Sequence, residues 1–272
     1  MNLAVLAGDG DLPVSLLKNL LDAKSTIIID LVPNRGIDLG IYSHKCYHFT
    51  IGEVVKILEA LKKNDVDRCV FAGKISKEVI FDRIDRGSSS KPNFDPFAIG
   101  LLESFKDKRD DTIMLSIINF LESNNFMVEK QSKFLQALFA KKKVYTHRVP
   151  TEKEMEDIKY GFFIAKELGR LDIGQTVVIK DRSVMAVESI EGTDRAIERG
   201  GTLGRNDTAV VKVAKVNQDE RFDIPTVGLS TLKTMLKVNS FILAVEAGKT
   251  FILDEENMVD FANKNNMTII AV

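Results

Sequence analysis

The residues with the most chemical potential lie in one short stretch, which runs from Lys212 to Gly228 and reads K-V-A-K-V-N-Q-D-E-R-F-D-I-P-T-V-G. It places two lysines and an arginine among three carboxylates, and a proline and a glycine near its end shape the backbone. Cations beside carboxylates are the groups that hold phosphates together with a metal ion or an activated water. A solvated strand followed by a charged turn has the same composition. The stretch therefore indicates a phosphate site only if other parts of the chain agree.

A second group of carboxylates, Glu188, Glu191 and Asp194, lies in a turn that follows an expected hairpin. Repulsion among these charges is unfavourable unless a cation or hydrogen-bond donors lie among them. Thr193 or Asp194 can also serve as the N-cap of a following helix, which explains one residue of the turn but not the crowding. Glu191, Gly192, Thr193 and Asp194 are therefore candidate ligand contacts.

A glycine turn follows the first expected strand, residues 2–7, and leads into a helix expected at 14–21. Such a turn aims backbone N–H groups at whatever lies beyond the strand, which favours an anion. The third glycine of a dinucleotide fingerprint is absent, so a plain strand-to-helix turn is an equally good interpretation of residues 8–11. Lys74 follows another expected strand, 68–72, at the strand end where open α/β sheets bind ligands.

The composition is that of a soluble globular protein with two domains, since 44% of the 272 residues are hydrophobic and 28% are charged. A net charge of -1 gives no excess of cations for nonspecific nucleic-acid binding. The two cysteines, Cys46 and Cys69, form neither a zinc pattern nor a disulfide framework. The start lacks a signal peptide and no apolar run approaches the roughly 20 residues that cross a bilayer, so we expect a cytoplasmic protein.

The residue types also limit the chemistry. The three histidines lie far from any pattern of an activated serine or cysteine, and there is no Walker loop. Acidic loops with Lys and Arg, in a chain without His or Cys clusters, suit Mg²⁺ or Mn²⁺ and phosphate oxygens. An aspartate can hold the metal or orient a water, while the cations neutralise charge on the phosphate.

The expected strands and helices place these residues in two α/β domains. Residues 1–132 alternate strands and helices, as in a Rossmann-like open sheet. Residues 133–272 predict an α/β or α+β domain after a linker. Thr151 and Glu154 form a capping box at the start of a helix, and a hairpin is expected over 176–188.

The opening stretch begins in a strand expected over 208–215. In a regular strand Lys212 and Lys215 point to opposite faces, so we expect one lysine in the site, Lys212, and the other outside it. Asp219 and Asp223 would share a helical face, but Pro225 and the density of polar residues favour a loop.

Five motifs follow one another along nearly the whole chain. They are A-G-D-G-D-L-P at the start, A-G-K after the third strand, L-D-I-G-Q-T-V-V, A-V-E-S-I-E-G-T-D and K-x-x-K-x-x-Q-D-x-R-F-D-I-P-T-V-G. Together they resemble the LpxI family of UDP-2,3-diacylglucosamine pyrophosphatases. The resemblance implies a cytoplasmic, Mg²⁺-dependent hydrolase of Gram-negative lipid A synthesis that splits UDP-2,3-diacylglucosamine into UMP and 2,3-diacylglucosamine 1-phosphate. It implies two domains with the lipid between them and a homodimer, which would meet its substrate at the inner face of the inner membrane.

Carried onto this sequence, the family's essential aspartate falls on Asp223, where it would bind the metal or activate water, with Asp219 as a second candidate. Positions of the family's ligand contacts match Gly8, Gly10, Asp11, Leu12, Lys74, Glu191, Gly192, Thr193, Asp194 and Lys212. Lys212 or Arg221 would balance charge on the diphosphate.

The sequence also departs from the family's pattern. G-K-I-S-K-E stands where the family tends to have an arginine and a proline after the lysine, and K-R-D-D stands for its usual G-D-D. Both departures affect contacts of the first domain. Two other classes remain as alternatives: a noncatalytic regulator that binds a UDP-sugar or an acyl-glucosamine, and an NAD-linked enzyme, against which the incomplete glycine fingerprint counts.

Overall fold

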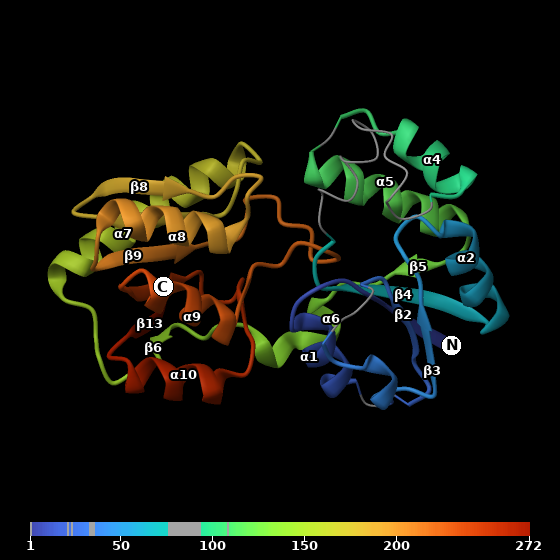
Figure 1. Ribbon diagram of the computed structural model, residues 1–272, viewed down its shortest axis with the longest axis horizontal. Coiled ribbons are helices and arrows are strands. Elements are labelled where there is room, and N and C mark those ends of the chain that lie inside the picture. The colour runs from blue at the N-terminus through green and yellow to red at the C-terminus, as the bar shows by residue number, and fades with distance from the viewer. Residues whose placement is uncertain (1, 21, 23, 33–35, 76–93, 108) are drawn as a thin grey trace. The chain divides into compact units, whose positions relative to one another are not determined.

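The computed structural model describes residues 2–20, 22, 24–32, 36–75, 94–107 and 109–272, which fold into two compact units (Figure 1). Unit 1 comprises residues 1–135 and 220–222, and unit 2 comprises residues 136–219 and 223–272. Within the stretch from Lys212 to Gly228, residues 220–222 therefore belong to unit 1, although their neighbours in sequence belong to unit 2. Both units combine strands and helices, which confirms the predicted α/β class.

The strands described in unit 1 form one parallel sheet in the order β3-β2-β1-β4-β5. Their bounds are β1 Asn2–Ala7, β2 Ile27–Asp30, β3 Lys45–His48, β4 Val66–Ala72 and β5 Met127–Val128. After β1 the chain builds outward through β2 and β3, and then returns to the other side of β1 with β4. The strand order thus reverses between β1 and β4, and the carboxyl ends of these two strands flank the place where open α/β sheets bind ligands.

The described helices of unit 1 cover both faces of this sheet (Figure 1). Their bounds are α1 Leu12–Asn19, α2 Val54–Lys63, α4 Pro96–Glu103, α5 Asp110–Ser123 and α6 Ser132–Leu135, with a 3-10 turn at Leu39–Ile41. Leu61 of α2 and Ile118 of α5 are buried in one cluster with Ala4 and Leu6. Because alternate strand residues face opposite sides, Val5 is buried on the other face, where α1 lies.

Residues 86–96 are rich in Ser, Pro and Asn and predict a loop, and no helix was expected directly after them, where the structure has α4. Residues 86–93 lie outside the described part of the chain. Asp95 begins the helix as its N-cap and accepts a hydrogen bond from the Ala98 amide, and Pro96 occupies the first turn, where a missing N–H is tolerated. The sequence D-P thus starts a helix here, although it was interpreted as part of a loop.

Unit 2 contains a sheet in the order β6-β13-β11-β9-β7-β8. Its strands are β6 Lys143–Val144, β7 Thr176–Lys180, β8 Ser183–Val187, β9 Thr208–Lys212, β11 Ser240–Val245 and β13 Thr268–Ala271. β9, β11 and β13 are parallel, whereas β7 runs antiparallel to β8 and β9. The β7–β8 hairpin confirms the prediction. A small parallel pair, β10 Thr226–Val227 and β12 Phe251–Ile252, lies outside this sheet.

The helices of unit 2 are α7 Glu152–Arg170, α8 Thr193–Gly204, α9 Leu229–Lys237 and α10 Glu255–Lys264, with a 3-10 turn at Gln136–Leu138. α7 and α8 pack on opposite faces of the sheet through glycines. A Cβ on Gly161 of α7 would lie 2.7 Å from Val211, and a Cβ on Gly200 of α8 would lie 2.5 Å from Val178. Thr151 caps α7 in the predicted capping box with Glu154.

In the described part of the chain, every helix is too short or too polar to cross a lipid bilayer.

Candidate functional site

One edge of the unit 2 sheet gathers most of the predicted polar residues. Because β7 is antiparallel to β9, the start of β7 pairs with the end of β9, with Thr176 opposite Lys212. The end of β11 lies on the other side, with Val245 opposite Lys212. The residues that follow β8, β9 and β11 therefore meet at a single edge, which we call the polar edge of unit 2.

The strand that carries Lys212 is shorter than predicted. β9 ends at Lys212. Val213 still donates its N–H to the Gln175 carbonyl at 3.0 Å, in register with β7, but the Ala214 amide donates to the Glu246 carboxylate at 2.9 Å instead of to a strand. Lys215 therefore does not belong to the strand, and the prediction that it points to the opposite strand face from Lys212 was wrong. Both lysines are buried, with 4% and 8% of their surface exposed, and each has its own carboxylate or hydroxyl partners.

Lys215 lies between two aspartates from distant parts of unit 2. Its Nζ is 2.6 Å from Asp172 Oδ1 and 3.0 Å from Asp223 Oδ2. The contact with Asp172 is a hydrogen bond, and the contact with Asp223 is an ion pair. Asp172 follows α7 directly in a left-handed conformation with φ of 56°. Asp172 was not predicted as a site residue, although the motif L-D-I-G-Q contains it.

Gln218 fixes the backbone of the same loop. The Lys215 amide donates to Gln218 Oε1 at 3.0 Å, and Gln218 Nε2 donates to the Asp223 carbonyl. The Asp223 amide donates to the Asp219 carbonyl at 3.2 Å. Asp219 and Asp223 thus lie in a closed turn, as expected, and the Asp223 side chain keeps 27% of its surface exposed. A carboxylate held in this way can meet a substrate while its orientation is fixed from behind.

Thr193 connects the acidic turn to Lys212. Its Oγ1 donates to Glu188 Oε1 at 2.7 Å and accepts from Lys212 Nζ at 3.1 Å. Lys212 Nζ also donates to the Thr226 carbonyl at 3.1 Å. The prediction that Thr193 or Asp194 caps the next helix was wrong: the N-cap of α8 is Gly192, with φ of 82° and no side-chain bond, and Thr193 is the first helical residue. Its hydroxyl belongs instead to a buried Glu–Thr–Lys chain.

The other acidic residues of the turn have different surroundings. Glu191 pairs with Arg199 of α8, with 2.5 Å between Oε1 and Nη2. Partial burial acts to raise the pKa of Glu191, but the hydrogen bond and the charge of Arg199 together with backbone hydrogen bonds outweigh it, and the pKa is lowered. Asp194 is exposed in the first turn of α8, where a negative charge is stabilised by the helix dipole. The crowding of carboxylates is thus relieved by Lys212 and Arg199, as the repulsion argument requires.

A second ion cluster, centred on Glu246, holds the backbone that leads from Lys212 to Lys215. Glu246, which follows β11, accepts from Lys166 at 3.0 Å, from the Ala214 amide at 2.9 Å and from Lys249 at 3.0 Å. Burial acts to raise the pKa of Glu246, but these three donors outweigh it and the pKa is lowered. The cluster fixes the segment between Lys212 and Lys215, because Lys166 also donates to the Ala214 carbonyl at 2.7 Å.

In unit 1 the predicted contacts lie at the carboxyl ends of β1 and β4. Asp9 and Lys74 form a backbone bridge, with N–H to O distances of 2.6 and 3.0 Å, and the Gly8 amide donates to Ala72 at 2.7 Å. The loops approach so closely that a Cβ on Gly8 would lie 2.6 Å from the Lys74 carbonyl. Since the Gly10 amide also donates to Asp9 Oδ1 at 2.8 Å, the turn uses these amides within the protein.

An anion at this edge would therefore meet the first turn of α1 and the exposed Lys74 side chain. Asp11 is exposed at the N-cap of α1, and the Leu12 side chain is buried with 8% exposed, so Leu12 can offer only its backbone. Arg221 belongs to unit 1, where its Nη1 lies 3.5 Å from Glu122 Oε1. The structure thus assigns the predicted residues to two groups, one in each unit.

The donor set bears on the predicted metal. Among the described residues, no group of three or more His, Cys, Asp or Glu side chains is arranged to hold a metal ion. Mg²⁺ is often held by one or two carboxylates, with water and substrate phosphates as the remaining ligands. Asp223 could supply such a carboxylate, because one of its oxygens faces Lys215 and the side chain remains partly exposed.

The whole chain matches two known domain families. Residues 2–138 match the LpxI N-terminal domain, and residues 141–270 match the LpxI C-terminal domain. The chain belongs to the LpxI family. It is also similar to the UDP-2,3-diacylglucosamine pyrophosphatase LpxI of Caulobacter vibrioides, with 27% identity over 286 residues that cover 99% of this chain and 97% of the relative. The predicted resemblance is thereby confirmed, and the polar edge lies within the LpxI C-terminal domain.

Proposed function

We propose that this LpxI protein hydrolyses the diphosphate of UDP-2,3-diacylglucosamine, which yields UMP and 2,3-diacylglucosamine 1-phosphate for lipid A synthesis. The observation that carries the proposal is the setting of Asp223, a partly exposed carboxylate held by the buried Lys215 within the motif R-F-D-I-P. The name of the Caulobacter relative supports the reaction, since that protein is a UDP-2,3-diacylglucosamine pyrophosphatase.

In the proposed mechanism the oxygen of a water molecule attacks one phosphorus of the diphosphate. The bond between that phosphorus and the bridging oxygen breaks, and the bridging oxygen leaves with the other phosphate. Asp223 orients the water and accepts its proton. Lys215 neutralises the carboxylate and Gln218 holds its backbone, so that Asp223 needs little reorganisation during the reaction.

Cations in the site would balance the charge of the diphosphate. Lys212 ends β9 at the polar edge, and Arg221 lies two residues before Asp223. Lys74 and the first turn of α1 provide positive potential at the edge of unit 1. Asp219, Glu191 and Asp194 complete the proposed set in unit 2.

A divalent ion is part of the proposal. Asp223 would hold Mg²⁺ or Mn²⁺, and when bound the ion would polarise phosphate oxygens and make the attacking water more acidic. We also propose a homodimer that acts in the cytoplasm, at the inner face of the inner membrane, where a diacylated substrate is available.

One assay tests the reaction. Purified protein is incubated with radiolabelled UDP-2,3-diacylglucosamine and Mg²⁺ or Mn²⁺, and UMP is separated by chromatography. We expect UMP from the wild type and a loss of at least about a thousandfold in Asp223→Ala, the scale of removing a central catalytic group. If no UMP is released with any divalent ion, the proposed enzymatic activity would be contradicted, and a noncatalytic binder of the same lipid would be favoured. Full activity of the variant would remove Asp223 from the mechanism.

A further inference from the structure

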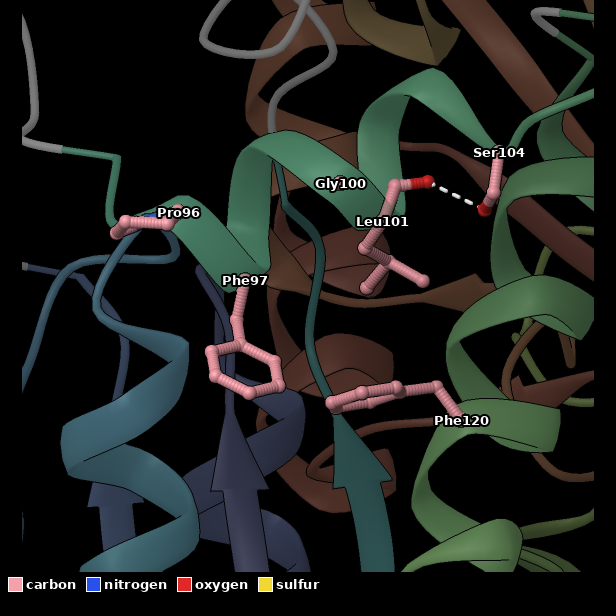
Figure 2. Close-up of a pocket in the computed structure, with 6 residues that line it drawn as sticks. All are labelled: Pro96, Phe97, Gly100, Leu101, Ser104 and Phe120. Carbon is pink, nitrogen blue, oxygen red and sulfur yellow. Dashed lines mark hydrogen bonds between the residues drawn. The ribbon is translucent and has the colours of Figure 1, made fainter.

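An apolar pocket of about 440 Å³ lies in unit 1 between α4 and α5. It is lined by Pro96, Phe97, Gly100, Leu101, Ser104 and Phe120. Figure 2 shows the side chains of Phe97, Leu101 and Phe120 directed toward one another around the hollow. None of the described lining residues carries a charge, and the Ser104 hydroxyl donates to the Leu101 carbonyl at 2.7 Å. The pocket therefore offers apolar contact without a polar group in need of a partner.

Phe97 is an exposed aromatic residue at the rim of the pocket. The ring is 60% exposed although it stands on a regular helix, whereas Phe120 opposite it packs on the core cluster of unit 1. The pocket thus has a wall anchored in the core and an apolar rim open to water. Exposed aromatic side chains around a preformed concave surface are typical of binding sites for apolar ligands.

Contacts of Asp95 place this pocket at the ligand-binding edge of the sheet. The Asp95 amide donates to the Gly52 carbonyl at 2.9 Å, and Asp95 Oδ2 accepts from the Val55 amide at 2.7 Å. α4 therefore begins beside the N-terminus of α2, which follows the carboxyl end of β3. Lys74 and the glycine turn lie at the same edge, after β4 and β1. Unit 1 thus presents a cation and an apolar pocket along one edge.

We propose that the α4–α5 pocket binds a fatty acyl chain of the substrate. This inference rests on the proposed function, because a diacylated nucleotide sugar carries apolar chains close to a diphosphate. Sugar or phosphate groups would lose their hydrogen bonds to water in this lining, whereas an acyl chain gains by leaving water. The diphosphate of the same molecule would lie toward Lys74, so that the two ends of an amphipathic ligand meet matching surfaces.

A fluorescence experiment tests occupancy without catalysis. The chain contains no tryptophan, so Phe97→Trp introduces a single reporter at the rim of the pocket. Phe163→Trp is the matched control, because Phe163 is also 60% exposed but lies on α7 in unit 2. The probe is 2,3-diacylglucosamine 1-phosphate with bromoacyl chains, whose bromine quenches tryptophan on contact. We expect saturable quenching at least threefold greater in Phe97→Trp than in Phe163→Trp, and none with the unbrominated lipid.

Equal quenching of both variants, or no quenching of Phe97→Trp, would contradict the proposal that the α4–α5 pocket binds an acyl chain. This result is separate from the hydrolysis assay. Quenching of the Phe97→Trp fluorescence without release of UMP would support the acyl pocket and contradict the proposed reaction. Release of UMP without quenching of the Phe97→Trp fluorescence would support the proposed reaction and contradict the acyl pocket.

Gly100 allows a second test by filling the pocket. A Cβ added there meets nothing within 4 Å, so a side chain can be introduced at this position of the lining. Gly100→Leu adds apolar volume to the pocket, and Gly100→Ala controls for the helix. We expect Gly100→Leu to raise KM for the long-chain substrate roughly tenfold, the effect of about two buried methylene groups. KM for the diacetyl analogue and kcat should not change. Equal effects on both substrates would overturn the proposal, as would a changed oligomeric state on gel filtration, which would make this face an interface between copies of the chain.

Discussion

Lys215 forms an ion pair with Asp223, with 3.0 Å between Nζ and Oδ2, and its ammonium is anchored at 2.6 Å by Asp172. The lysine is buried and Asp223 is partly exposed. Because Asp172 holds the buried Lys215 ammonium, that ammonium keeps the Asp223 carboxylate in a fixed place. Asp172 therefore acts on Asp223 through Lys215, as a positioning residue.

Asp172→Asn should lower kcat about tenfold or more with little change in KM, because the substrate still binds while Asp223 loses its fixed orientation. The pH profile of kcat should also change, since the variant leaves Lys215 with one carboxylate fewer. The matched control is Asp181→Asn, which removes the same charge from an exposed pair with Lys153 and should leave both constants unchanged. A kcat and a pH profile equal to those of the wild type in Asp172→Asn would contradict the positioning role.

Thr193 should be important for stability even though it is a small residue. Thr193→Val keeps the shape but leaves Glu188 and Lys212 without the hydroxyl that joins them. We expect the free energy of unfolding to fall by about 1–3 kcal/mol, the usual cost of an unsatisfied buried polar group. Thr193→Ser should restore most of it. Thr202→Val, on the exposed side of α8, should change stability by no more than about 0.5 kcal/mol in the same urea titration.

The fold could be predicted well where the hydrophobic pattern and the turn signals agree. The β7–β8 hairpin, the capping box of α7 and the first β–α–β unit follow from such local signals. Helix α4 was missed because D-P signals a helix start as well as a turn. Strand β9 was predicted too long because Val213 and Ala214 are apolar and buried like strand residues, although the Ala214 amide donates to the Glu246 carboxylate instead of to a neighbouring strand.

The candidate site could be predicted only as a set of residues near one another in sequence. The charged stretch and the acidic turn were both singled out, and Lys212 and Thr193 do connect them. Asp172 and Glu246 were missed because they reach the polar edge from α7 and β11, and nothing in a single sequence links them to Lys215 or Ala214. Long-range pairing of buried charges depends on the sheet order, which local patterns do not contain.

The two cysteines should differ sharply in reactivity. Burial raises the pKa of the Cys69 thiol to about 12, with the nearby Asp67 charge adding to the effect, and Cys69 is fully buried in β4. Cys46 is only half-buried, in β3. A thiol reagent at pH 8 should therefore modify one cysteine in the native protein and two in guanidinium chloride. Mass spectrometry that finds the native label on Cys69 would contradict this assignment.

The cluster around Glu246 should make stability depend on pH in the acid range. The pKa of Glu246 is lowered in the folded protein relative to about 4.3 in an unfolded chain. The group therefore contributes stability that is fully present above about pH 5 and is lost as the pH falls through the folded pKa. Glu246→Gln should lower the free energy of unfolding by roughly 2 kcal/mol at pH 7, and this difference from the wild type should shrink below about pH 4.3.

Urea titrations of Glu246→Gln and the wild type between pH 3.5 and pH 7 measure this difference. Glu167→Gln is the control, because Glu167 forms an exposed pair with Arg170 on α7, and pairs of this kind contribute at most about 1 kcal/mol. A difference that stays constant down to the lowest pH would show that the Glu246 carboxylate does not stabilise the fold through its charge. A difference that shrinks would instead confirm that Lys166 and Lys249 hold an ionised Glu246, which fixes the backbone between Lys212 and Lys215.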